Sequence, residues 1–498
     1  SIVEFTTQNA GGATTYTWTN DTPSIGLSDS GSGNILAFTA TNSSTAPIVA
    51  TITVTPTSEI NDITCPGEDK TFTITVNPTA QVDKPTDQVV CNGADVSVLF
   101  STQNTLGSTS YSWVSDIEIG AGLSGNDNMN FTATNSSTEP IVATITVTPE
   151  FENDSKFCAG EDKTFTITVN PTAQVDQPVD QVVCNGDDVS VVFTTQNTLG
   201  FTSYSWVSDT QIGAGLSGND NMNFTATNSS TAPIVATIIV TPEFENDGKV
   251  CAGEDKTFTI TVNPTVQVNA LVDEYITSGD TSSLVNISSS TNNVTFNWTA
   301  VADSGITGLL NSSSTDTTFI PAETLFNSGN EPLEVTYTIY PILNSPTECP
   351  VDPVVYKVIV NPTPSIVSIE DKILCDQQLT SIIFLSGTSG GNVTYNWTSD
   401  IEIGAGLSGT GDMNFTATNL TTAPIVATIT VTPVFENGGV TNEGDSVSFT
   451  ITVNPSAQVD QPVDQVVCNG DSTSIVEFTT QNAGGATTYT WTNDTPSI

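Results

Sequence analysis

The chain has 498 residues, of which 54 are acidic, only 8 are basic and none is histidine, and its formal net charge at pH 7 is −46. This shortage of basic side chains excludes a surface that follows nucleic-acid phosphates, and it disfavours an anionic membrane surface. The missing arginine and histidine also remove bidentate phosphate clamps, Ser-His-Asp and Cys-His catalysis, and histidine metal sites. No apolar run approaches the ~20 residues of a membrane span. We therefore expect neither an enzyme nor direct membrane insertion.

The elements predicted along the chain are short strands, most clearly in the stretch 172–264. Residues that favour strands alternate there between clusters of Gly, Pro, Asn and Asp, and they predict strands at 181–183, 189–193, 203–207, 223–227, 234–240 and 257–262. The strand at 234–240 lies between Pro233 and Pro242, and no helical periodicity is present. Six or seven short strands around one central tryptophan are typical of an immunoglobulin-like β-sandwich.

The same pattern repeats along the chain. An Asn-Pro pair closes a strand-like run at positions spaced by 93, 93, 98 and 93 residues, namely Asn77, Asn170, Asn263, Asn361 and Asn454. One tryptophan per repeat occupies an equivalent position, and we expect each to be a core residue: Trp18, Trp113, Trp206, Trp298, Trp397 and Trp491. The predicted domains are 1–78 (partial), 79–171, 172–264, 265–362 (divergent), 363–455 and 456–498 (partial).

A longer repeat lies over the first. Residues 474–498 are identical to residues 1–25, whereas the equivalent segment at 95–116 differs. This identity indicates a super-repeat of 473 residues that contains five domains. We expect the chain to be an internal window of a longer filamentous protein.

All eight cysteines fall into two equivalent slots of the repeat. The early slot holds Cys91, Cys184, Cys375 and Cys468, and the late slot holds Cys65, Cys158, Cys251 and Cys349. Their spacing, without histidine, does not suit a metal site. Recurring slots predict structural disulfides in an oxidising compartment, with Cys91, Cys158, Cys184, Cys251, Cys349 and Cys375 as the candidates.

Two connectivities remain open from the sequence. Pairing within a domain gives Cys91–Cys158 and Cys184–Cys251; it leaves Cys468 for the next copy of Cys65, and it joins Cys349 to Cys375 because the slots at Thr277 and Asn442 lack cysteine. Pairing across every junction leaves Cys251 and Cys468 far apart. The first scheme is favoured because it leaves no pair of cysteines stranded. It is opposed by geometry, because a sandwich places the two slots of a domain near opposite poles, beyond the ~7 Å limit between the Cα atoms of a disulfide.

No cofactor is expected, with calcium as the one ion to consider. Asn219–Asn221 and Glu243–Gly248 offer oxygen ligands, but no Asp-x-Asp-x-Asp-Gly loop exists, and scattered acidic residues also keep a long secreted chain soluble. Paired carboxylates for glycoside hydrolysis are disfavoured, because the same acidic residues recur in every repeat and suit a scaffold better than one active site.

The Tyr-x-Trp strand, the Cys-x-Gly-Asp/Glu segments and the Val-x-Val-Asn-Pro ends together resemble the PKD-like, Ig-like repeats of giant Bacteroidetes surface proteins, above all the gliding-motility adhesins exported by the type 9 secretion system. The resemblance covers the whole chain and is weakest in 265–362. It implies tandem sandwiches that form an extended filament outside the cell, associated with the outer membrane. A structural stalk for adhesion and gliding is the function implied, with secretion and motility machinery and an external surface or polysaccharide as partners. The alternative is a module whose variable loops bind a carbohydrate or a host ligand.

Overall fold

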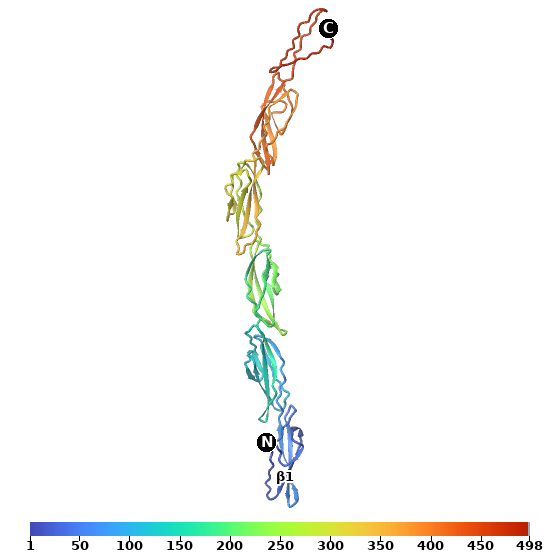
Figure 1. The fold of residues 1–498 in the computed structure, drawn as a ribbon, viewed down its shortest axis with the longest axis vertical. Helices are drawn as coiled ribbons and strands as arrows, with labels where there is room; N and C mark the ends of the chain where they lie inside the picture. The colour runs from blue at the N-terminus through green and yellow to red at the C-terminus, as the bar shows by residue number, and fades with distance from the viewer. Residues whose placement is uncertain (497–498) are drawn as a thin grey trace. The chain divides into compact units, whose positions relative to one another are not determined.

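The computed structural model describes residues 1–496, and its secondary structure consists of β-strands and one single-turn 3-10 helix, η1 (Pro23–Ile25). Figure 1 shows the strands along the chain, coloured by residue number. The chain separates into two compact parts. The first part contains residues 1–227 and 234–262, and the second contains residues 228–233 and 263–498.

The first part contains three sets of strands. Residues 1–78 form β1 (Ala13–Asn20), β2 (Ser30–Ser32), β3 (Ile48–Ile60), β4 (Ile63–Pro66) and β5 (Lys70–Val76). Residues 79–171 form β6 (Gln88–Cys91), β7 (Asp95–Val98), β8 (Ser108–Ser115), β9 (Ser124–Asn126), β10 (Met129–Thr132), β11 (Ile141–Asn153), β12 (Lys156–Ala159) and β13 (Lys163–Asn170). Residues 172–264 repeat this series as β14 (Gln181–Cys184), β15 (Asp188–Val191), β16 (Phe201–Ser208), β17 (Ser217–Asn219), β18 (Met222–Thr225), β19 (Ile234–Asn246), β20 (Lys249–Ala252) and β21 (Lys256–Asn263).

Each complete set is a sandwich of a large sheet and a two-stranded sheet. In 172–264 the large sheet has the order β14-β21-β19-β16-β17, with β20 paired to β19, and β15 pairs with β18 in the other sheet. Val189 and Val191 from the small sheet share one core with Ile238 and Ile260 from the large sheet. The all-β, Ig-like sandwich expected from the alternating sequence is therefore present.

The long strand β19 departs from the prediction. All six predicted strands of 172–264 exist, but the one predicted to end at 240 continues through Pro242 to Asn246, and β17 and β20 were not predicted. Pro242 is tolerated because it lies between two partners on one side of β19: the pairing with β21 stops at Val240, and the pairing with β20 starts at Glu243. No ladder bond is lost there to the missing N–H.

The tryptophans lie where the large sheet faces the core. Trp18, Trp113, Trp206, Trp298 and Trp397 are all buried. Beside Trp206, a Cβ atom on Gly218 of β17 would lie 2.3 Å from the indole ring, so only glycine allows this edge strand to approach. The glycines beside Trp18, Trp113 and Trp397 make the same close approach.

The second part contains the divergent domain and its neighbour. Residues 265–362 form β22 (Glu274–Thr277), β23 (Val285–Asn286), β24 (Val294–Ala302), β25 (Ile306–Thr307), β26 (Ser313–Ser314), β27 (Phe319–Ile320), β28 (Phe326–Asn327), β29 (Leu333–Leu343) and β30 (Val354–Asn361). Residues 363–455 form β31 (Lys372–Cys375), β32 (Leu379–Ile382), β33 (Asn392–Ser399), β34 (Ser408–Thr410), β35 (Met413–Thr416), β36 (Ile425–Asn437), β37 (Val440–Glu443) and β38 (Val447–Asn454). In the divergent core the indole N–H of Trp298 donates to the carbonyl of Phe319, 3.1 Å away.

Trp491 corrects the expectation that every tryptophan is a core residue, because its side chain is 72% exposed. Its counterpart Trp18 packs against Ile52 and Val54 of β3. Residues 456–498 contain no counterpart of β3, and no strand is formed between 456 and 496. The indole of Trp491 therefore has no facing strand to cover it.

Candidate functional site at the domain junctions

The most regular polar contacts lie where one domain ends and the next begins. At the end of 79–171, the Asn170 side chain donates to the backbone carbonyl of Asn246 at 3.1 Å, and the Asn246 side chain donates back to Asn170 Oδ1 at 3.0 Å. Asn246 ends β19 and forms the tip of the β19–β20 hairpin, which extends beyond the pairing with β21. The hairpin of one domain therefore binds the Asn-Pro end of the preceding domain.

This reciprocal asparagine pair recurs in both parts of the chain. Asn77 and Asn153 exchange hydrogen bonds of 3.2 and 3.0 Å in the first part. Asn361 and Asn437 exchange hydrogen bonds of 3.1 and 2.9 Å in the second part. Each pair joins an Asn-Pro end to the tip of the following hairpin, so the contact is a property of the repeat.

A second contact joins another loop of each domain to its successor. The backbone N–H of Thr105 donates to the carbonyl of Thr45 at 2.9 Å, and that of Thr198 donates to the carbonyl of Thr138 at 3.0 Å. In the second part the same bond runs from Ser389 to Asn330 at 2.9 Å and from Ala483 to Thr422 at 2.7 Å. Two contacts at separate positions restrict rotation more than one contact does.

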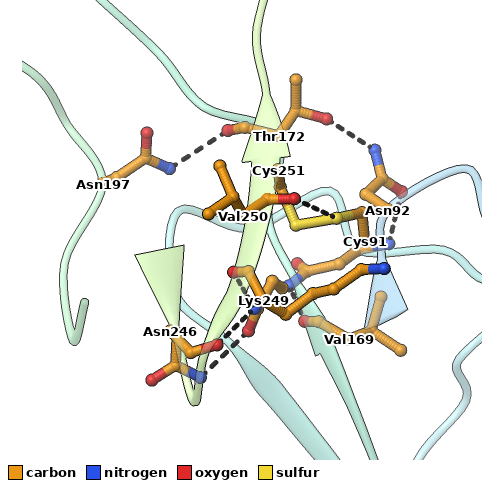
Figure 2. Close-up of a disulfide and its surroundings, with 11 residues drawn as sticks. Cys91, Asn92, Val169, Thr172, Asn197, Asn246, Lys249, Val250 and Cys251 are labelled. Carbon is orange, nitrogen blue, oxygen red and sulfur yellow. Dashed lines mark hydrogen bonds between the residues drawn. A yellow bond between two sulfur atoms is a disulfide. The ribbon is translucent and has the colours of Figure 1, made fainter. Parts of the chain in front are cut away.

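The disulfide adds a covalent contact at the junction between 79–171 and 172–264 (Figure 2). Cys91 ends β6, which runs parallel to β13 with Cys91 in register with Asn170. Cys251 lies on β20, opposite Phe244 of β19. The two cysteines are bonded across a sequence separation of 160, with their Cα atoms 5.5 Å apart. Next to the bond, the Asn92 side chain donates to Thr172 Oγ1 at 2.9 Å.

Neither of the two connectivities left open by the sequence contains this bond. Cys91 pairs with Cys251 and not with Cys158, which is a free thiol. Pairing inside 79–171 fails because Cys91 lies just beyond the start of β11, where its neighbour Val90 is level with Ile141 through Val169, whereas Cys158 lies opposite Phe151 near the end of β11. At least ten residues of strand separate the two cysteines, roughly 33 Å at ~3.3 Å per residue.

Of the six candidate disulfide cysteines, Cys158 and Cys375 are free thiols, so the prediction is wrong for these two. The possible bond between Cys184 and Cys251 does not form, because Cys251 is bonded to Cys91. The possible bond between Cys349 and Cys375 does not form either. Cys184 and Cys349 are each disulfide-bonded. The remaining free thiols are Cys65 and Cys468.

The junction between 265–362 and 363–455 has no cysteine. Its early slot is Thr277, in register with Asn361, and its late slot is Asn442 on β37. The Asn442 side chain instead donates to the carbonyl of Pro362 at 3.1 Å. The ring of Tyr275 covers the hairpin tip so closely that a Cβ atom on Gly438 would lie 2.2 Å from it.

Several acidic and amide side chains form hydrogen bonds within their own sandwich. Asn221 Oδ1, considered as a calcium ligand, accepts the N–H of Phe193 at 2.9 Å. Asp87 and Asp371 accept the N–H groups of Thr166 and Thr450, both at 2.7 Å, and these backbone hydrogen bonds hold the pKa of each carboxyl below its ordinary value. Among residues 1–496 no three His, Cys, Asp or Glu side chains gather as a metal site would need. In the same range no helix is long and apolar enough to cross a membrane.

Comparison with known proteins gives the class of domain. Residues 276–364, in the divergent domain, match the family of the PKD-like domain. No curated protein matches the chain. Among solved structures, titin domains I67-I69 show 9% identity and a TM-score of 0.34, covering 57% of this chain and 100% of that one. Drosophila N-cadherin EC1-4 shows 10% identity and a TM-score of 0.25, covering 74% of this chain and 99% of that one. At these values the likeness carries no information about function.

Proposed function

We propose that the chain is a structural stalk of a large secreted adhesin, in which tandem sandwiches are held end to end by their junctions. The observation that carries the proposal is the recurring pair Asn77–Asn153, Asn170–Asn246 and Asn361–Asn437, which fastens the end of one domain to the hairpin of the next. Domains of this class are typically structural or adhesive modules. A chain of fastened domains presents something at a distance from its anchor.

The chemistry of the junctions supports resistance to bending. Each Asn-Pro end carries a proline, whose fixed φ and missing N–H limit the conformations of the linker. The asparagine pair and the backbone bond from Thr198 to Thr138 lie at different positions on the same junction. The net charge of −46 adds repulsion between neighbouring domains, which salt screens beyond ~8–10 Å.

Disulfides support a location outside the cytoplasm, because they persist in oxidising compartments. The finer assignment is to gliding motility: an outer-membrane-associated filament, exported by type 9 secretion, that grips an external surface or polysaccharide. It rests on the resemblance of the Tyr-x-Trp and Asn-Pro motifs to such adhesins. For the carbohydrate-binding alternative, the tryptophans of the folded domains offer no stacking platform, because Trp18, Trp113, Trp206, Trp298 and Trp397 are buried.

Small-angle X-ray scattering of the oxidised chain tests the stalk. A long strand such as β19 has 13 residues and spans roughly 43 Å at ~3.3 Å per residue, so five domains end to end should give a maximum dimension on the order of 200 Å. A compact globule of 498 residues would instead have a radius of gyration of about 23 Å. A profile with that smaller radius at physiological salt would mean that the domains fold back on one another, and the stalk would be abandoned.

A further inference from the structure

The two cysteine slots of a junction are occupied together or left empty together. At the junction between 79–171 and 172–264, the early slot Cys91 is bonded to the late slot Cys251. At the junction between 265–362 and 363–455, the early slot is Thr277 and the late slot is Asn442, 165 positions away. The early slot of one domain is therefore matched with the late slot of the next domain, not with the late slot of its own.

The four free thiols occupy the slots that have no match within the chain. Cys65 and Cys158 are late slots, and the early slots that would match them precede residue 1. Cys375 and Cys468 are early slots, and the late slots that would match them follow residue 498. The N-terminal half of the chain thus has two late slots without a partner, and the C-terminal half has two early slots without a partner. Each kind of slot is the partner that the other kind needs.

We propose that these four thiols are halves of two interdomain disulfides that form with a tandem copy of the same 473-residue sequence. Cys375 bonds Cys65 of the following copy, and Cys468 bonds Cys158 of the following copy. Both separations are then 163 residues, between the 160 of Cys91–Cys251 and the 165 of the Thr277 and Asn442 slots. Every cysteine of the repeat then has a matched slot, and the interdomain cross-links continue from copy to copy.

The local geometry at both ends matches that of the formed disulfide. Cys375 ends β31 in register with Asn454, as Cys91 ends β6 in register with Asn170. Cys65 lies on β4 opposite Ser58, in the position that Cys251 holds on β20. Both thiols are exposed.

The start of the following domain is also seated as the proposal requires. The N–H of Ala483 donates to the carbonyl of Thr422 at 2.7 Å, and the equivalent bond joins Thr198 to Thr138 at the junction that carries the Cys91–Cys251 disulfide. Each new disulfide forms by thiol–disulfide exchange with an external disulfide such as oxidised glutathione. The two protein thiols lose two protons and two electrons, and the external disulfide is reduced to two thiols.

The proposal is tested on a protein that carries residues 1–473 followed by residues 1–498, refolded in a glutathione redox buffer. Each copy alone has four free thiols, so unlinked copies should give eight in a titration with Ellman's reagent under denaturing conditions. We expect four. Peptide mapping without reduction should find Cys375 of the first copy linked to Cys65 of the second, and Cys468 linked to Cys158. Eight thiols, or bonds between other members of this set, would overturn the proposal.

Two matched variants check the slot rule in the single chain. Asn442→Cys creates a late slot whose own domain carries Cys375 and whose preceding domain carries Thr277. The rule predicts five thiols, since the new cysteine finds no early-slot partner; a bond to Cys375 would give three and would refute the rule. Adding Thr277→Cys should return the titration to four. In the two-copy protein, Cys65→Ser in the second copy should raise the titration from four to five. Thiol counts report connectivity and scattering reports shape, so this inference and the stalk proposal fail separately.

Discussion

Two junctions with the same hydrogen-bond framework are closed in different ways. Both have the reciprocal asparagine pair, Asn170–Asn246 in the first part and Asn361–Asn437 in the second. The first, here called the disulfide junction, adds Cys91–Cys251, whereas the second, the cysteine-free junction, has Thr277 and Asn442 in the matching slots. The asparagine hydrogen bonds are therefore sufficient to hold the hairpin against the preceding domain. The disulfide adds a covalent bond to a contact that the hydrogen bonds already form.

The two junctions also respond differently to force. While Cys91–Cys251 is intact, the residues between the two cysteines cannot be extended, although they include most of two domain cores. At the cysteine-free junction, the hydrogen bonds and the ring of Tyr275 on Gly438 oppose separation only until they break. The disulfide junction therefore limits how far the chain can be extended, whereas the cysteine-free junction resists separation only up to the force that breaks its hydrogen bonds.

The largest effect should come from reduction. In single-molecule pulling from both ends of the chain, reduction should lengthen the fully unfolded molecule by at least the segment between Cys91 and Cys251. That gain is on the order of 500 Å at ~3.3 Å per residue. In the chain-entropy model, closing so long a loop stabilises the fold by about 5 kcal/mol. Cys375→Ser removes a free thiol and should leave the oxidised length unchanged. If the fully unfolded chain has the same length with and without reductant, Cys91–Cys251 does not limit extension, and the two junctions do not differ in this respect.

The second prediction is that the domains beside the two junctions, 172–264 and 363–455, depend equally on their core tryptophans for stability. Trp206 and Trp397 are both 6% exposed in matching cores, so Trp206→Ala and Trp397→Ala should each cost roughly 3–5 kcal/mol. Calorimetry of the full chain should show one domain transition displaced by a similar amount in each variant. Trp491→Ala is the control and should displace none, because its side chain is 72% exposed. A much larger cost at Trp397 would mean that the domains, and not their junctions, differ.

The sandwich could be predicted from the sequence because strand periodicity is local. Alternation located the strands of 172–264, and the equivalent tryptophan slots located cores. The prediction that the strand ends before Pro242 was wrong, because whether a proline ends a strand depends on the strand beside it. Pro242 lies where the partner of β19 changes from β21 to β20. The prediction that Trp491 is a core residue was wrong, because a tryptophan is buried only where another strand packs against it, and its position in the repeat does not guarantee that strand.

The junction could not be predicted in the same way, because it depends on a hairpin that extends past its own sheet. Neither pairing within a domain nor pairing between adjacent slots contains Cys91–Cys251. Two signals were nevertheless present in the sequence. Asparagine recurs at 153, 246 and 437, the last strand position before each hairpin turn. Cysteine is absent at both Thr277 and Asn442, which matches an early slot to the next domain's late slot.

A third prediction breaks the hydrogen-bond framework at one junction at a time. Asn361→Ala removes both bonds to Asn437, each worth about 0.5–1.5 kcal/mol net, and nothing covalent replaces them. The distribution of distances between fluorescent labels in 265–362 and 363–455 should broaden. Asn170→Ala is the matched variant, and labels in 79–171 and 172–264 should keep a narrow distribution because Cys91–Cys251 remains. Equal broadening in both variants would show that the disulfide does not hold the junction.

The smallest expected effect is acid sensitivity of the strand that carries the early slot. Asp87 precedes β6 and Asp371 precedes β31, and backbone hydrogen bonds from Thr166 and Thr450 lower the pKa of each carboxyl from its ordinary 3.8. A carboxyl whose pKa is lowered on folding contributes stability above the unfolded value, and the contribution is lost as the pH falls through the folded value.

The melting temperature should therefore decline below a pH of 3.8 in the parent chain, and less steeply in Asp87→Asn and Asp371→Asn, whose amides keep an acceptor without titrating. Both carboxyls are exposed, so each change is small. The acid-induced loss of strand order should nevertheless be greater at β31 than at β6, since Cys375 is a free thiol in this chain whereas Cys91 is tied to β20. Hydrogen exchange of the two strands between pH 4 and pH 2, compared before and after reduction, measures that difference. If reduction does not bring the hydrogen-exchange rate of β6 closer to that of β31, the disulfide does not protect β6 from acid.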